Sequence, residues 1–180
     1  DLTITPKISI VTVSFNNKSN LMSTIESVLC QSRKPFEFII VDGGSSDGTP
    51  DLLLELTDDF IYWISEPDEG IYDAMNKGIK KSNNDIIVFC NSGDSFYKNS
   101  LKNLIKIFNE KNVDFVFGTV RRNYTRTSIV KFGFDPKRIF YNFDFATAHS
   151  TGFFLKKKIY KKIGLYDLKF RCSSDYDLYL

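Results

Sequence analysis

Histidine, cysteine and net charge are all scarce in this sequence of 180 residues. The one histidine is His149, and the three cysteines, Cys30, Cys90 and Cys172, lack the spacing of a metal-binding set. An odd cysteine count in a domain of this size favours reduced thiols in a cytosolic setting over a disulfide framework. The formal net charge of +2 creates no strong field, so nucleic acid is not expected as a partner.

Long apolar runs are also missing. No stretch approaches the roughly 20 apolar residues that cross a bilayer, and no basic region followed by an apolar region indicates a signal peptide. We therefore expect a cytoplasmic protein. The hydrophobic content of 42% and charged content of 26% are ordinary globular values. The length suits one domain, residues 1–180, with a substantial core.

Apolar β-branched runs alternate with helical patterns along the chain. Strands are expected at residues 8–13, 36–41, 61–64, 86–90, 115–118 and 152–155. Helices are expected at residues 19–31, from residue 49, and at 71–81, 100–111 and 156–163, with Ser19 or Asn20 capping the first. This alternation predicts an α/β fold with a mainly parallel sheet. Residues 121–145 break the rhythm and read as a lid or insertion. A last helix begins at residue 174 and suggests a truncated C-terminal part.

Two acidic residues stand where expected strands end. Asp42 closes an apolar run and precedes the turn Gly43–Thr49, and Asp94 lies in the turn Asn91–Asp94 after another apolar run. Ligands of open α/β sheets bind outside the carboxyl ends of the strands, and a cation on a diphosphate needs only one or two carboxylates. Either aspartate alone can equally be a helix cap, but the matching positions favour a metal–nucleotide site.

Three further features carry weaker signals. The turn Gly43–Thr49 offers backbone N–H groups to a phosphate, although an ordinary turn explains its glycines as well. Asp175 and Asp177 begin the last expected helix, where such pairs are usually caps. His149 precedes a stretch of small residues and can contact a metal or a departing phosphate, but a lone histidine is more often structural.

Five segments together resemble the family 2 glycosyltransferases, which have the GT-A fold. The likeness spans nearly the whole chain and is most similar to bacterial members that build capsule, exopolysaccharide or O-antigen. The segments are ISIVTVSFNN at 8–17, IIVDGGSSDGT at 39–49, GIYDAMNKG at 70–78, NSGD at 91–94 and SDYDL at 174–178.

This resemblance implies an inverting enzyme with a nucleotide-diphospho-sugar donor, a hydroxyl acceptor and Mg²⁺ or Mn²⁺. It implies an α/β/α sandwich whose residues 1–100 bind the nucleotide and whose residues 101–180 form an incomplete acceptor and catalytic half. The implied catalytic base is Asp175, and the implied metal ligand is Asp94. The implied donor-binding residues are Val13, Phe15, Asp42, Asp73, Asn76, Gly93, Asp94 and His149.

The chain departs from the family pattern at several positions. Asn91 and Gly93 stand where many members have aspartate, so metal binding rests mainly on Asp94. Ser174 replaces the usual glutamate before Asp175, and Ser150 stands where relatives often have glutamine. The C-terminal segment of the family is absent from this sequence.

Alternatives remain open at this stage. A sugar nucleotidyltransferase needs a basic Gly-rich loop after the first strand, which Ser14–Lys18 does not supply. A binding module without catalysis would grip a nucleotide or glycan but not turn it over. The donor sugar, the base, the acceptor and the oligomeric state are not predicted. A lipid-linked acceptor would bring the protein to the inner face of the membrane.

Overall fold

The computed structural model describes residues 5–123, 128–131, 150–171, 174 and 178. Its first half alternates strands and helices, in the order β1 (Ile8–Ser14), α1 (Lys18–Leu29), β2 (Glu37–Asp42), α2 (Thr49–Leu54), β3 (Ile61–Ser65), α3 (Ile71–Lys81) and β4 (Ile86–Phe89). Its second half contains α4 (Ser100–Glu110), β5 (Phe115–Phe117), β6 (Val120–Asn123), β7 (Ser128–Lys131), a 3₁₀ turn (Ser150–Gly152), β8 (Phe153–Lys156) and α6 (Lys157–Ile163).

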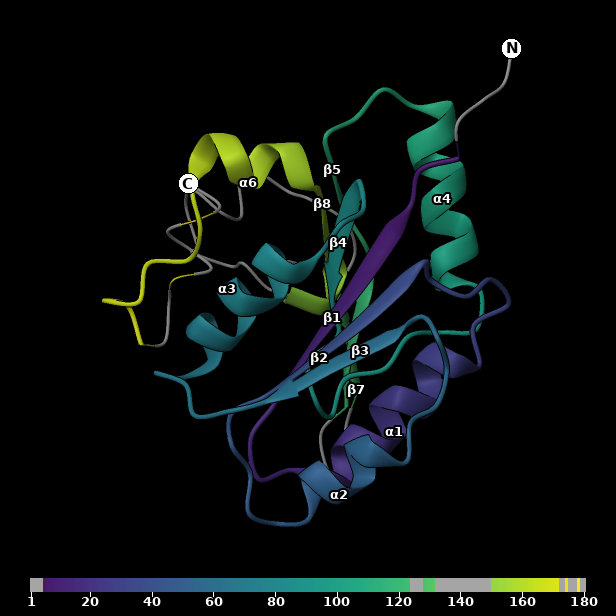
Figure 1. Ribbon diagram of the computed structural model, residues 1–180. Helices are drawn as coiled ribbons and strands as arrows, with labels where there is room; N and C mark the ends of the chain where they lie inside the picture. Colours follow the sequence, from purple (N-terminus) through teal and green to yellow (C-terminus); the bar gives the residue numbers. More distant parts are fainter. Residues whose placement is uncertain (1–4, 124–127, 132–149, 172–173, 175–177, 179–180) are drawn as a thin grey trace.

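Six of these strands form one twisted sheet in the order β3-β2-β1-β4-β8-β5 (Figure 1). The strands β3, β2, β1 and β4 are parallel, while β8 runs antiparallel to both β4 and β5. The prediction of a mainly parallel sheet is therefore confirmed. Strand β8 is the exception, and it lies between two neighbours that both run in the opposite direction.

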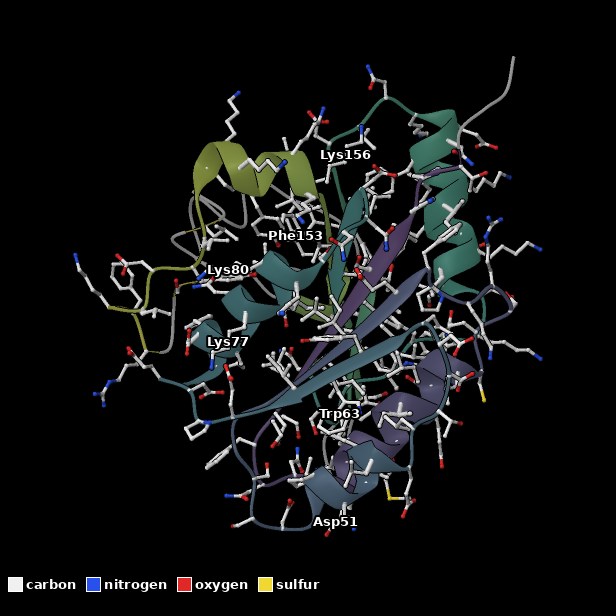
Figure 2. The ribbon with its side chains drawn as sticks, viewed as in Figure 1. Asp51, Trp63, Lys77, Lys80, Phe153 and Lys156 are labelled. Carbon is white, nitrogen blue, oxygen red and sulfur yellow. The ribbon has the colours of Figure 1, made fainter. Side chains whose placement is uncertain are left out.

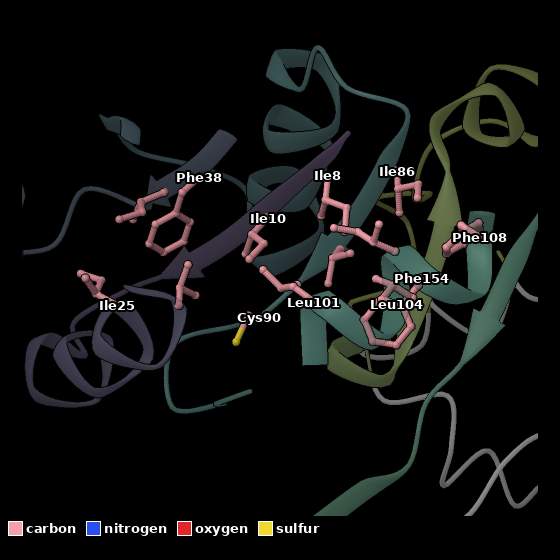
Figure 3. Close-up of a cluster of buried hydrophobic side chains, with 14 of the residues drawn as sticks. Ile8, Ile10, Ile25, Phe38, Ile86, Cys90, Leu101, Leu104, Phe108 and Phe154 are labelled. Carbon is pink, nitrogen blue, oxygen red and sulfur yellow. The ribbon is translucent and has the colours of Figure 1, made fainter. Parts of the chain in front are cut away.

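The sheet is covered on both faces, which gives three layers. Helices α1, α2 and α4 lie on one face, and α3 and α6 lie on the other (Figure 1). Alternate residues of each strand serve different faces: Ile10 belongs to the cluster beneath α1 and α4 (Figure 3), whereas Val11 belongs to the cluster beneath α3. Strands buried on both faces explain why their sequences are continuously apolar rather than alternating.

The first helix begins earlier than its sequence predicts. Neither Ser19 nor Asn20 is the cap, because α1 starts at Lys18 after Asn17, whose side chain caps no backbone N–H group. The side chain of Asp47 takes that role from a distant turn, since its Oδ2 accepts a hydrogen bond of 2.8 Å from the Lys18 backbone N–H. Because this capping partner is 29 residues away, the sequence around Lys18 does not indicate where the helix begins.

The region expected to be a lid contributes a small second sheet. Strands β6 and β7 pair antiparallel, from Val120 with Lys131 to Asn123 with Ser128, as expected for hairpin-like pieces. The rest of residues 121–145 lies outside the described residues, so closure over a ligand stays a prediction. No helix in the described part of the chain is both long and apolar enough to cross a membrane.

Candidate active site

The carboxyl ends of β1, β2 and β4 meet at one edge of the sheet. The Ser14 carbonyl accepts a hydrogen bond of 2.9 Å from the Gly43 N–H, and the Val13 carbonyl accepts one of 3.0 Å from the Ser92 N–H. The turns that carry Asp42 and Asp94 therefore flank the last residues of β1. At this edge the connections from β1 lead to β2 on one side and those from β3 lead to β4 on the other. Ligands of open α/β sheets bind at such a change in the direction of the strand order.

The Asp42 side chain is fixed by hydrogen bonds from two serine residues. Its carboxylate is fully buried and accepts hydrogen bonds from the Ser45 N–H at 2.9 Å, from the Ser65 hydroxyl at 2.6 Å and from the Ser45 hydroxyl. Ser45 in turn accepts a hydrogen bond of 2.7 Å from the Asn16 N–H. This network ties the ends of β1, β2 and β3 together, and three donors satisfy most of the capacity of a buried carboxylate.

The turn after Asp42 is organised by its own polar side chains. Asn16 Oδ1 accepts a hydrogen bond of 2.9 Å from the Ser46 N–H. Hydrogen bonds from the Thr49 hydroxyl and then from the Lys18 N–H hold the pKa of the Asp47 carboxyl below its usual value. These side chains thus fix the shape of the turn, and its role in cradling a phosphate stays a prediction.

Asp94 is half-buried on the turn after β4, next to Gly93 with φ of 100°. The hydroxyl of Thr24 from α1 joins this turn, since it accepts a hydrogen bond of 3.0 Å from the Gly93 N–H and donates one of 2.8 Å to the Asp94 carbonyl. The hydroxyl of Thr151 donates a hydrogen bond to Asp94 Oδ2. Sequence reasoning missed both threonines, because neither lies in a motif or near Asp94 in the chain.

The donor set at this edge fits a cation that arrives with a diphosphate. Among the described residues, no three His, Cys, Asp or Glu side chains gather closely enough to form a metal cage by themselves. A magnesium ion bound to phosphates usually takes only one or two protein carboxylates. Asp94, with its orientation fixed by Thr151, can supply that one ligand.

A second group of residues surrounds Gly43. Val13 is buried, while the Phe15 ring just beyond β1 is 63% exposed. A Cβ atom on Gly43 would lie only 2.6 Å from Asp68 Oδ2 and 3.3 Å from Cδ2 of Phe15. A larger residue at position 43 would therefore displace the Asp68 carboxylate and press on the Phe15 ring. Asp68 was not among the predicted site residues, because its position in a later loop gave no signal.

The predicted residues of α3 contact protein groups. Asp73 is half-buried and pairs with Lys77 at 3.6 Å, and Lys77 also pairs with Glu66 at 2.9 Å. Figure 2 shows Lys77 on α3 beside the loop that follows β3. Burial opposes the charge of Lys77, but the hydrogen bond to Glu66 and the charge of Asp73 outweigh it and raise the pKa of Lys77 above its usual value. Asn76 is buried and binds the backbone of Tyr166.

A wide groove of about 1370 Å³ opens beside Asp94, between the start of α4 and strands β5 and β6. Its polar lining includes Asn99, Asn103 and Arg121. The Tyr97 ring is exposed in this groove, and the Arg121 guanidinium lies 6.0 Å from the centre of that ring.

Two predicted residues lie outside the described residues. They are His149 and Asp175, so their roles stay predictions. Their neighbours are described: the Ser150 hydroxyl accepts a hydrogen bond of 3.1 Å from the Asn91 amide, and Ser174 is fully buried. The structure thus brings Val13, Phe15, Asp42 and the Gly93–Asp94 turn to one edge of the sheet.

Comparison with known proteins gives consistent matches. The family described as Glycosyl transferase family 2 matches residues 9–164. An uncharacterized glycosyltransferase of Mycobacterium tuberculosis is 43% identical over 96 residues, which are 53% of this chain and 37% of that protein. A PGL/p-HBAD biosynthesis glycosyltransferase of Mycobacterium bovis is 27% identical over 179 residues, covering 96% of this chain and 68% of that protein. The chain thus spans little more than a third of the first relative.

Solved structures extend the comparison to the fold. Residues 1–349 of S. aureus TarS in complex with UDP match with a TM-score of 0.78 at 16% identity, covering 96% of this chain and 53% of that one. The mannosyltransferase PcManGT from Pyrobaculum calidifontis, in complex with GDP-Man and Mn²⁺, matches with a TM-score of 0.71 at 19% identity, covering 98% and 52%. At these identities the likeness establishes a shared fold.

Proposed function

Because this chain belongs to glycosyl transferase family 2 and has the GT-A fold, we propose that it transfers a sugar, with inversion, from a nucleotide-diphospho-sugar to a hydroxyl acceptor. The acceptor would be a growing bacterial polysaccharide such as capsule, exopolysaccharide or O-antigen. The observation that carries the proposal is the joining of the Asp42 and Asp94 turns to the two last residues of β1. That arrangement places one acidic residue on each side of the end of β1.

The donor would lie across the carboxyl ends of β1, β2 and β4. Val13 and Phe15 would contact the base, and Asp42 would hydrogen-bond it with the acceptor capacity that the donors from Ser45 and Ser65 leave. Gly93 and helix α3, which carries Asp73 and Asn76, would border the sugar diphosphate, while the Asn76 amide itself binds the Tyr166 backbone. The complexes of TarS with UDP and of PcManGT with GDP-Man support a nucleotide donor of this class. The exposed ring of Phe15 beside Gly43 and Asp68 suits stacking against a base.

Asp94 would hold Mg²⁺ or Mn²⁺ together with the diphosphate oxygens, and the Mn²⁺ complex of PcManGT supports such a cation. The cation would neutralise the charge that develops on the departing diphosphate. The Thr151 hydroxyl orients the Asp94 carboxylate through one oxygen. His149, two residues before Thr151, would lie near the departing phosphates.

Asp175 would take the proton from the acceptor hydroxyl as that oxygen attacks the anomeric carbon. A positioned carboxylate base accelerates such a step by roughly 10²–10⁴-fold. The displacement is single, so no side chain forms a covalent intermediate. The groove beside Asp94, with its exposed Tyr97 ring and amide side chains, offers space for the acceptor glycan.

We also propose that the enzyme acts in the cytoplasm, at the inner face of the membrane, when its acceptor is lipid-linked. Lysines are frequent on α6, whose last residue Ile163 is exposed, and the exposed apolar side chains Leu165, Leu168 and Phe170 follow that helix. Adjacent basic and apolar side chains suit an anionic lipid surface.

Two variants test this proposal. Asp94→Asn should weaken binding of UDP or GDP in the presence of Mn²⁺, because the cation loses its protein carboxylate. Asp175→Asn should lower turnover by at least about 100-fold and leave nucleotide binding unchanged. Calorimetry with UDP and GDP, with and without Mn²⁺, measures the first effect, and nucleotide release from a panel of UDP- and GDP-sugars measures the second.

The outcomes separate the rival functions. Full turnover in Asp175→Asn would remove this residue as the base. Nucleotide binding without turnover of any sugar donor would indicate a binding module. Release of pyrophosphate from a nucleoside triphosphate and a sugar phosphate would indicate a nucleotidyltransferase.

A further inference from the structure

Helix α3 is fixed against the centre of the sheet. Its buried residues Ala74, Met75 and Ile79 belong to the same cluster as Val11 of β1. At Gly78 the helix backbone approaches so closely that a Cβ atom would lie 2.3 Å from Cγ1 of Val11. Because close-packed interiors resist displacement, α3 is fixed in position, and a group that its side chains bind is fixed with it.

From this helix, the Asn76 side chain binds a backbone segment that is distant in the sequence. Its side-chain nitrogen donates a hydrogen bond of 2.9 Å to the Tyr166 carbonyl, and its Oδ1 accepts one of 3.0 Å from the Tyr166 N–H. The side-chain amide thus pairs with both backbone groups of one residue, as a neighbouring strand would. Both residues are buried, at 5% and 3% exposure, so losing this pairing would remove two hydrogen bonds from a site that water does not reach.

Aromatic contacts reinforce the same point. The Tyr166 ring stacks on Tyr72 of α3 with ring centres 5.3 Å apart, and it meets the edge of Phe89 of β4 at 6.0 Å. Phe89 precedes the turn that carries Asp94. Tyr166 therefore contacts α3 and the strand that leads to the candidate metal ligand.

The chain beyond Tyr166 leads to the predicted base. Ser174 is fully buried, and Leu178 packs against the cluster that contains Tyr72 and Tyr166. These two residues bracket Asp175, which itself lies outside the described residues. Asn76 thus joins the start of this segment to α3 through two hydrogen bonds.

We propose that Asn76 is a positioning residue, which holds the Tyr166 backbone and thereby sets the place of the segment that carries Asp175. The inference rests on the proposed function, because Asp175 is the base only if the protein is a glycosyltransferase. It differs from the prediction that Asn76 contacts the donor. The two roles predict opposite kinetic effects, since a donor contact changes nucleotide affinity whereas a misplaced base lowers kcat.

The test compares Asn76→Leu, which keeps the side-chain size but loses the amide, with Ile105→Ala on α4. Ile105 belongs to the other core cluster, so its variant controls for a general loss of stability. The first readout is hydrogen exchange of residues 164–178, which needs no substrate. The second is the split between kcat and donor KM for the UDP- or GDP-sugar that the wild type turns over, together with the affinities for UDP and GDP.

We expect Asn76→Leu to speed exchange in residues 164–178 but not in α1, and to lower kcat by at least about ten-fold, with KM and nucleotide affinity within about two-fold. Ile105→Ala should change neither the exchange of that segment nor kcat. Unchanged exchange, or weaker nucleotide binding at an unchanged kcat, would overturn the proposal. If the wild type turns over no nucleotide sugar, the proposed function fails while exchange still decides whether Asn76 holds the segment. If Asn76→Leu does not fold, Asn76→Ala provides the same readouts.

Discussion

Replacing Gly78 with alanine tests how tightly α3 is held against β1. The added Cβ atom would lie 2.3 Å from Cγ1 of Val11, and Val11 has no room to move because it is fully buried. Overpacking of this kind costs about 1–3 kcal/mol. Alanine in place of glycine inside a helix returns up to about 1 kcal/mol. We therefore expect Gly78→Ala to lower the free energy of unfolding by about 1–2 kcal/mol.

A second substitution makes the reasoning refutable. Val11→Ala removes both γ-methyl groups that face Gly78, at a cost of about 1.6 kcal/mol for two carbons plus a cavity. In the double variant the methyl group introduced at position 78 fills part of that cavity. The two changes should then cost less together than their sum, by about 1 kcal/mol or more. Urea unfolding followed by circular dichroism measures all four proteins, and additivity within about 0.5 kcal/mol would refute the close contact.

Three further predictions concern the site. Ser65→Ala removes one of the donors to the buried Asp42 and should lower the free energy of unfolding by about 1–3 kcal/mol; a change below about 0.5 kcal/mol in urea unfolding would contradict it. Thr151→Val removes the hydroxyl that orients Asp94 and should weaken binding of UDP or GDP with Mn²⁺ by about 2- to 10-fold in calorimetry, whereas Thr57→Val at the exposed Thr57 should not. Burial, and next the negative charge of Asp94, raise the pKa of the Cys90 thiol. Iodoacetamide at about pH 8 should therefore label the exposed Cys30 in the native protein and Cys90 only after unfolding. Mass spectrometry of the labelled peptides distinguishes the two cysteines.

The strands were predictable because burial on both faces leaves a strong composition signal. Apolar residues dominate β1, β2 and β4, so their existence and order followed from the sequence, and the acidic turns after β2 and β4 followed from those strand ends. The start of α1 was not predictable, because its capping partner Asp47 comes from another turn.

The supporting residues of the site were harder to find than its acidic residues. Thr24 and Thr151 contact the Asp94 turn from an N-terminal helix and from a turn 57 residues beyond it. Asn76 lies in a motif, but only the fold shows that Tyr166 is its partner. Pairings between residues far apart in the chain depend on tertiary structure, which a single sequence does not display.

The division of each central strand between two core layers has a consequence for how this enzyme can be modified. Ile10 packs beneath α1 and α4 while its neighbour Val11 packs beneath α3. The apolar side chains on both faces of β1 are therefore buried, and none of them tolerates a polar replacement. Libraries aimed at a new donor or acceptor should therefore leave the strands intact. They should vary the exposed lining of the groove around Tyr97, where side chains can change without disturbing either layer.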